Sequence, residues 1–195
     1  SGDSQLCYSK LKEHYMKLGY FDKKEKKLPM HVNNICIITS ESGAALQDML
    51  YVFTNNGYRG KVTVKCAMVQ GKDCPKTIAT SLAMMDTWGF DVIIISRGGG
   101  SYEDLCGFNN EMIIEALHLM KTVTISAIGH EIDVVLSDYV ADIRAPTPTY
   151  AAELIVRHQI ELGYYLNLAN NYKQLLLSEL TKSANKAIDI CRLYN

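Results

Sequence analysis

Proline is scarce in this sequence of 195 residues, and it is unevenly distributed. Only 4 prolines are present, and none follows Pro148, so the C-terminal segment lacks the residue that most readily breaks a helix. No apolar run approaches the ~18 residues of a membrane-spanning helix, so no membrane association is expected. The 6 cysteines contain no CxxC pair and no zinc-ligand spacing, which indicates reduced thiols in a cytoplasmic protein.

The chain also has no surplus of charge of either sign. It carries 20 lysines and arginines against 21 aspartates and glutamates, a formal net charge of −1. Such a chain has no global positive field that would attract nucleic acid, so any contact with nucleic acid is expected to be a local patch. The basic run at 23–27, KKEKK, is typical of a solvated loop, and a direct role in nucleic-acid binding is the alternative.

The stretch 92–111, VIIISRGGGSYEDLCGFNNE, carries the strongest functional signal. It begins with an apolar, β-branched run that is typical of a strand buried on both faces. Arg97 and a run of glycines follow, and the backbone N–H groups of such a loop can form an anion-binding concavity. A tight strand-to-helix turn with a solvated arginine is the alternative. The residues expected to bind phosphate here are Gly98, Gly99, Gly100 and Ser101.

Apolar segments alternate with segments of helical spacing through the middle of the chain. Strands are expected at 35–39, 62–69, 92–95 and 123–128, with helices at 44–53, 75–88 and 110–120. This order predicts an α/β fold with an open, mostly parallel, doubly wound sheet of about four strands, followed by a long C-terminal α-helix. We expect an N-terminal helix and linker at residues 1–30, an α/β domain at 31–146 and the long helix at 147–195.

Three polar loops each follow a predicted strand. They are Ser40–Gly43, Ser96–Ser101 and Gly129–Asp133. Ligands of open α/β sheets bind outside the carboxyl ends of the strands, so these loops are expected to converge on one edge. Ser42 and Gly43 of the first loop therefore join the expected phosphate-binding residues.

The residues after Pro148 have the spacing of a coiled-coil seam. Steps of three and four residues connect Leu162, Tyr165, Ala169, Tyr172, Leu176, Leu180, Ala184, Ala187 and Cys191. We expect this helix to self-associate or to form a helical hairpin, because it has no core of its own. A helix folded back across the α/β domain is the alternative.

Several long motifs resemble the large subunit of exonuclease VII. They are SRGGGSYEDLCGFNNE, SAIGHEIDVVLSDYVADIRAPTPTYAAE, ITSESGAALQDML and LKEHYMKLGYFDKKEKKLP, and they cover roughly residues 8–160. The resemblance implies hydrolysis of single-stranded DNA to short oligonucleotides by a metal-independent nuclease domain. It also implies that a helical region binds a small subunit. Family functional positions match Asp48, Arg97, His130 and Asp133.

The residue types at these positions suit phosphodiester hydrolysis. Arg97 offers a planar fork matched to phosphate, and His130 can transfer a proton near neutral pH. Asp133 lies three residues further on, where one helical turn would bring it beside His130. Asp48 in the first predicted helix of the α/β domain can reach the same pocket. The alternatives are a solvated carboxylate for Asp48 and a structural histidine for His130.

A magnesium site is the less favoured interpretation of the carboxylates. Asp48, Asp133, Asp138 and Asp142 are numerous enough to supply the one or two ligands that Mg²⁺ usually takes. The arginine and histidine make a metal less necessary, so no cofactor is expected. A different class of function is a non-catalytic phosphate- or DNA-binding module that assembles through its C-terminal helix.

Overall fold

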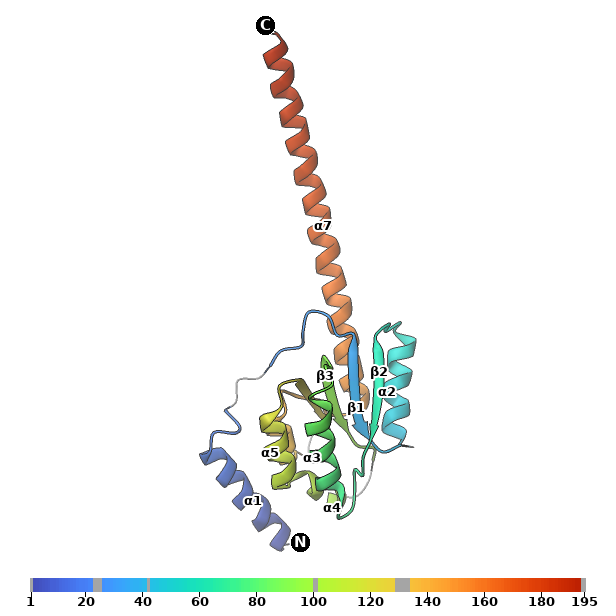
Figure 1. The fold of residues 1–195 in the computed structure, drawn as a ribbon, viewed down its shortest axis with the longest axis vertical. Coiled ribbons are helices and arrows are strands. Elements are labelled where there is room, and N and C mark those ends of the chain that lie inside the picture. The colour runs from blue at the N-terminus through green and yellow to red at the C-terminus, as the bar shows by residue number, and fades with distance from the viewer. Residues whose placement is uncertain (1, 23–25, 42, 100–101, 129–133, 194–195) are drawn as a thin grey trace. The chain divides into compact units, whose positions relative to one another are not determined.

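The computed structural model describes residues 2–22, 26–41, 43–99, 102–128 and 134–193 (Figure 1). The chain divides into two compact units, Ser1–Val156 and Arg157–Asn195. We refer to them as the sheet unit and the helix unit. All strands of the described residues belong to the sheet unit.

The strands are β1 (Asn34–Thr39), β2 (Lys61–Cys66), β3 (Val92–Ser96), β4 (Val123–Ala127) and β5 (Ile143–Arg144). The helices are α1 (Gly2–Lys17), α2 (Ala44–Asn55), α3 (Cys74–Met85), α4 (Tyr102–Leu105), α5 (Glu111–Leu119), α6 (Leu136–Val140) and α7 (Pro148–Leu193), with a 3₁₀ turn η1 (Cys106–Phe108). This alternation confirms the α/β class that the sequence predicts.

The strands form one sheet in the order β2-β1-β3-β4-β5, and every pairing is parallel. Isoleucines on neighbouring strands face the same side, as in the pair Ile37 and Ile94. The sheet has five strands where the sequence indicated about four. The additional strand, β5, is only two residues long, so it shows no periodicity that could be recognised.

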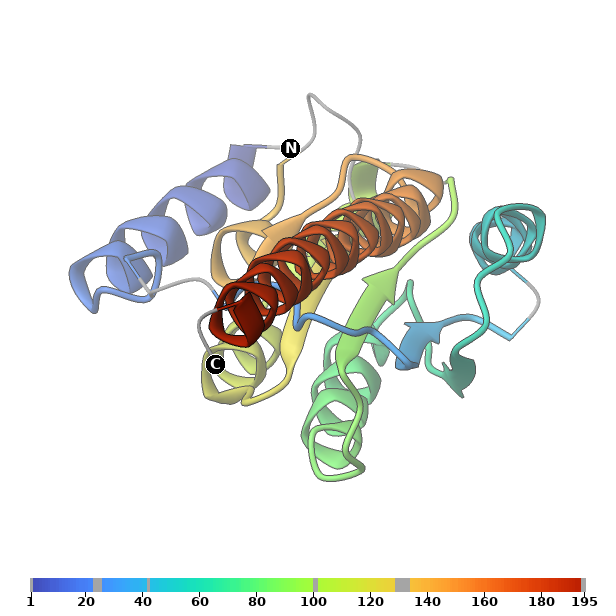
Figure 2. The same ribbon diagram turned by 90° about the horizontal axis from the view of Figure 1, so that it is seen from above.

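Helices cover both faces of the sheet, which makes it doubly wound. Alternation along β1 sends Ile37 into a core with Met49 of α2, and Ile38 into a second core with Ile78 of α3 and Ile113 of α5. Figure 2 shows α2 on one side of the sheet and α3 and α5 on the other. The two helical layers thus bury both faces of the isoleucine-rich strands.

Glycine residues follow the ends of α1 and α2, and a capping residue marks the start of α5. Gly19 follows α1 with φ 74°, and Gly57 follows α2 with φ 67°, a backbone conformation that other residues rarely adopt. Asn110 caps α5 by accepting a hydrogen bond from the Met112 N–H at 3.0 Å. These features agree with the predicted ends of α1 and α2 and with the predicted start of α5.

A buried ion pair fastens the segment after α1 to the sheet. Asp142 accepts hydrogen bonds from the backbone N–H of Lys26 at 3.0 Å and from the Thr124 N–H and hydroxyl at 2.9 and 2.8 Å. The Lys26 ammonium lies 2.8 Å from the same carboxylate. Burial alone would raise the pKa of Asp142, but the bonds from Lys26 and Thr124 outweigh it and hold the pKa below its usual value.

The first turns of α7 belong to the sheet unit. Ala151, Ala152 and Ile155 are fully buried in the core that α2 shares. The compact unit therefore extends to Val156.

The helix unit has a different character. Leu175, Leu176 and Leu180 are 62%, 65% and 66% exposed, and no residue of 160–192 is buried. None of the described helices is long and apolar enough to cross a membrane.

Candidate functional site

The order of the strands places a crevice between β1 and β3. The chain leaves β1 through α2 toward β2 on one side, and it leaves β3 through α4 and α5 toward β4 on the other side. Connections that depart in opposite directions leave a crevice outside the carboxyl ends of the two strands, and ligands of such sheets bind there. The Ser40–Gly43 and Arg97–Gly99 segments flank this crevice.

The glycine loop lies close to the beginning of α2. A Cβ atom added to Gly98 would lie 3.8 Å from the Ala45 backbone nitrogen. Gly43 is the N-cap of α2, and it supplies no side-chain cap to the first-turn N–H groups. The positive end of α2 and the backbone of Gly98 are therefore neighbours, which is an arrangement that suits an anion.

Buried hydroxyl groups end both strands at this crevice. Thr39 and Ser96 are the last residues of β1 and β3, and both are fully buried. By alternation they face the α2 side of the sheet, as Ile37 and Ile94 do. Among the residues that the structure describes, neither hydroxyl has a hydrogen-bond partner.

The side chain of Arg97 lies inside the protein. Arg97 is 3% exposed, and its Nη2 donates to the Asp104 carboxylate at 3.2 Å. Its charge also affects Cys74 at the start of α3: burial raises the pKa of the Cys74 thiol to about 11, and Arg97 acts against that rise. The guanidinium is thus held at a fixed place beside an anion, next to the glycine loop.

Asp104 is a site residue that the sequence did not reveal. It lies in α4, seven positions after Arg97, and its side chain is 32% exposed. In the sequence the acidic pair after the glycines indicated the first turn of a helix. Asp104 could have been identified as an acidic residue that follows Arg97 closely enough in the sequence to form an ion pair with it.

A second unexpected cluster lies between β4, β5 and α6. Asp138 accepts a hydrogen bond from the Ser126 hydroxyl at 2.6 Å and from the Val135 N–H at 3.1 Å. Arg144 lies 3.4 Å from the same carboxylate. Burial raises the pKa of Asp138 above its usual value despite these partners. The cluster connects the strand that precedes the His130 segment to the helix that follows it.

The structure places Asp48 on the surface of the sheet unit. Asp48 is exposed on α2, where it lines a shallow depression with Gln47, Tyr51 and Thr54. Gly99 has open space beside it, since a Cβ atom added there would have no neighbour within 4 Å. The remaining expected site residues, Ser42, Gly100, Ser101, His130 and Asp133, lie outside the described residues.

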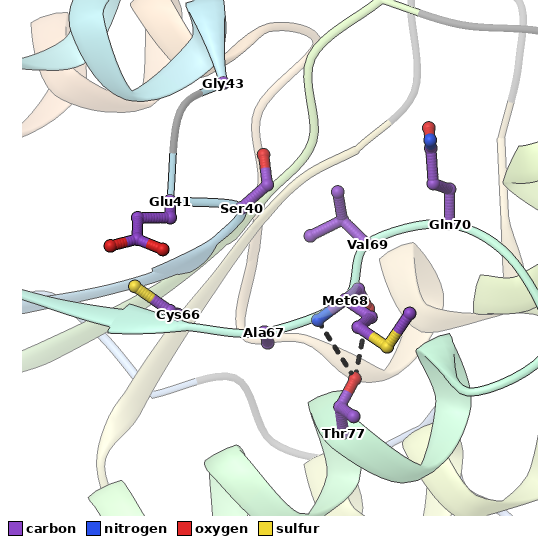
Figure 3. A pocket seen from close by; sticks show the side chains of 9 residues that line it. All are labelled: Ser40, Glu41, Gly43, Cys66, Ala67, Met68, Val69, Gln70 and Thr77. Atoms are coloured by element: carbon purple, nitrogen blue, oxygen red, sulfur yellow. Dashed lines mark hydrogen bonds between the residues drawn. The ribbon is translucent and has the colours of Figure 1, made fainter.

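A surface pocket of about 610 Å³ adjoins the crevice on the β2 side. Ser40 and Gly43 line it together with the segment 66–70 that follows β2. Figure 3 shows the side chains of Ser40, Val69 and Gln70 pointing in a common direction, while Thr77 bonds the segment from the opposite side. The sequence indicated the Ser40–Gly43 side of this pocket, but no motif indicated the segment 66–70, which carries no charged residue and no glycine.

Clusters with the composition of a metal site are not found in the part of the chain that the structure describes. Within those ranges, no three His, Cys, Asp or Glu side chains lie close enough to share one ion.

The fold defines a class: an open, parallel, doubly wound α/β domain with a topological switch point between β1 and β3 and a buried arginine directly after β3. The family model for "Exonuclease VII, large subunit" matches residues 20–193. The chain belongs to this family.

Curated relatives agree with this assignment. The exodeoxyribonuclease 7 large subunit of a Nitratiruptor species is 45% identical over 182 residues, which are 93% of this chain and 42% of the relative. The protein of the same name from Sulfurimonas denitrificans is 40% identical over 195 residues, 99% of this chain and 47% of the relative. The chain thus spans less than half the length of these relatives.

Proposed function

We propose that this chain is the nuclease domain of an exonuclease VII-like large subunit, which hydrolyses phosphodiester bonds of single-stranded DNA to short oligonucleotides. The observation that carries the proposal is the buried guanidinium of Arg97 beside a glycine loop at the switch point. A guanidinium held in a low-dielectric environment stabilises a phosphorane-like transition state more than a solvent-exposed guanidinium does. Relatives over 93–99% of the chain carry the name of such an enzyme.

In the proposed reaction, Arg97 and the backbone N–H groups at Gly98 bind the non-bridging oxygens of the scissile phosphate. A water oxygen bonds to phosphorus as the bond from phosphorus to the leaving deoxyribose oxygen breaks. The water loses one proton, and the leaving oxygen gains one. His130 and Asp133 are the proposed proton carriers, since imidazole and carboxylate groups perform these transfers at neutral pH. Asp48 is the fourth proposed catalytic residue, and no metal is needed.

Asp104 has a supporting role in this proposal. It holds Nη2 of the Arg97 guanidinium at 3.2 Å, which restricts the orientation of the planar fork. The cluster of Asp138, Ser126 and Arg144 fixes the elements on either side of the His130 segment. Both clusters would keep the catalytic groups in position without touching the substrate.

The proposed partners follow from the relatives and from the helix unit. A "large subunit" has a smaller companion, and the exposed leucines of the helix unit offer a surface for it and for self-association. The proposed compartment is the cytoplasm, because all six cysteines are free thiols.

The test is hydrolysis of end-labelled single-stranded DNA by the full assembly of large and small subunits in excess EDTA. We expect short, acid-soluble oligonucleotides. Cleavage that EDTA abolishes and magnesium restores would overturn the metal-free chemistry and reassign the aspartates as ligands. DNA binding without cleavage under all conditions would instead favour the non-catalytic module.

A further inference from the structure

The surface beside the proposed phosphate site contains two adjoining depressions. The pocket of about 610 Å³ lies next to the switch point, and a second of about 490 Å³ continues from it over the end of β2 and the first turns of α3. They share Cys66, Met68 and Thr77. Because they share these residues, we treat the two depressions as one groove. Ser40 and Gly43 line the first depression, so this groove begins beside the proposed phosphate site.

The floor of this groove is fixed in place. The Thr77 hydroxyl accepts a hydrogen bond from the Met68 N–H at 3.2 Å, and it lies 3.1 and 3.2 Å from the carbonyl oxygens of Met68 and Cys74. Val69 is buried, and Ala67 packs against the core around α3. The segment therefore presents its outer side chains without first having to order itself.

The chemistry of the groove changes along its length. Near the phosphate site the wall combines the apolar side chains of Ala67 and of Met68, which is 51% exposed, with the acidic side chain of Glu41. A thioether adapts its shape and makes favourable contacts with aromatic rings. The adjacent Gln70 amide can both donate and accept a hydrogen bond. These properties suit a planar heteroaromatic base without demanding a particular one.

The far part of the groove is basic. Lys65 from β2 and Lys76 from α3 line the second depression, where Asp73 is the one acidic residue among the described lining residues. Lysines bind backbone phosphates as point charges, and such contacts are independent of sequence. On a chain with net charge −1, this is a local patch of the kind that nucleic-acid binding requires.

We propose that this groove holds the nucleotide next to the scissile phosphate of single-stranded DNA, with its base on Met68 and Ala67 and its outer phosphate on Lys65 and Lys76. The inference rests on the proposed function and adds a substrate subsite to it. The two volumes are in the range of pockets that hold one small ligand, which is the size of a nucleotide.

The test measures DNA binding separately from cleavage. The full assembly, carrying His130→Ala so that the DNA stays intact, is titrated with a labelled oligothymidylate at several salt concentrations. We expect Lys65→Gln with Lys76→Gln to weaken binding several-fold and to lower the salt-dependence slope by about 0.7 for each lysine. The control pair Lys10→Gln with Lys61→Gln has the same change in charge away from the groove.

Equal slopes for the two pairs would overturn the subsite. Failure of the groove pair to assemble with the small subunit would also overturn it, because the surface would then be a protein interface. A second readout is photo-cross-linking with 5-iododeoxyuridine, which should label the segment 66–70; labels confined to other segments contradict the proposal. If the wild-type assembly hydrolyses nothing, the proposed function fails, and the binding result still stands by itself.

Discussion

The sheet unit and the helix unit use apolar side chains in opposite ways. In the sheet unit, isoleucines such as Ile37, Ile94 and Ile113 are fully buried between two layers of helices. In the helix unit, Leu176 and Leu180 are about two-thirds exposed at 65% and 66%. Large apolar side chains are thus buried within the chain in the sheet unit and exposed in the helix unit.

In the proposed function, this difference separates chemistry from assembly. Arg97 and the crevice between β1 and β3 depend on the packed sheet, which places the ends of the strands side by side. The described residues that line the groove all belong to the sheet unit. Substitutions in the two units should therefore have effects of different kinds.

The largest contrast is expected in stability. Ile94→Ala removes a fully buried side chain from the central strand β3, and we expect it to lower the free energy of unfolding by about 2–5 kcal/mol. Leu176→Ala on the exposed helix should change it by less than about 0.5 kcal/mol. Chemical denaturation of both variants at low protein concentration measures this. Similar losses for the two would show that the helix unit is buried in solution.

The next contrast concerns activity. Arg97→Ala removes the proposed phosphate fork, and we expect a loss of about 3 kcal/mol of transition-state stabilisation, more than a hundredfold in rate. His130→Ala should cost about a hundredfold to ten-thousandfold if the imidazole transfers a proton.

Steady-state hydrolysis of single-stranded DNA by the full assembly measures both losses. Arg59→Ala, an exposed arginine outside the groove, is the matched control and should leave the rate unchanged. A full rate for Arg97→Ala, with the assembly intact, would remove the arginine from the mechanism.

Assembly should respond to the helix unit. Leu176→Asp places a charge on the exposed leucine stripe, and burying this unpaired carboxylate against a partner costs on the order of several kcal/mol. We expect sedimentation to show a shift from dimer toward monomer, with circular dichroism unchanged. A monomeric wild type, or an unchanged dimer in the variant, would refute self-association through this stripe.

The smallest effect is a pH-dependent one in the sheet unit. Lys26→Met leaves the buried Asp142 carboxylate without its ammonium partner, and we expect a loss of about 1–3 kcal/mol near neutral pH. Because Lys26 helps to hold the pKa of Asp142 low, the stability from this pair is present above the usual aspartate pKa and is lost as the pH falls through the folded pKa.

The loss caused by Lys26→Met should therefore shrink in acid as Asp142 becomes protonated. Urea denaturation of wild type and variant from neutral pH down to the acid range measures this dependence. Lys27→Met, one residue away and exposed, is the control. A difference between wild type and variant that stays constant with pH would mean that the loss arises from packing and not from the ion pair.

The longer helices and strands can be predicted from the pattern of neighbouring residues. The isoleucine runs of β1 and β3 and the glycines at 19 and 57 predict elements that the structure contains, because burial and backbone conformation act on neighbouring residues. β5 could not be predicted in this way, since two residues have no period. Its pairing with β4 is decided by distant chain segments.

Fewer of the candidate site residues can be predicted from the sequence, because their contacts join separate elements of the chain. Arg97 stood out because it adjoins three glycines, but its partner Asp104 became recognisable only from the folded positions of the two side chains. The Asp138 cluster joins two strands and a helix, and no local spacing indicates such a meeting. Asp48 is a motif residue that lies on an exposed face of α2.

The most direct measurement is an experimental structure of the full assembly with phosphorothioate single-stranded DNA bound. The account predicts a backbone phosphate at the carboxyl edge of β1 and β3, with its oxygens about 2.7–2.9 Å from the Arg97 guanidinium nitrogens. The neighbouring base should lie on Met68. DNA resolved elsewhere on the sheet unit, with Arg97 bound to Asp104 and to no phosphate, would contradict it.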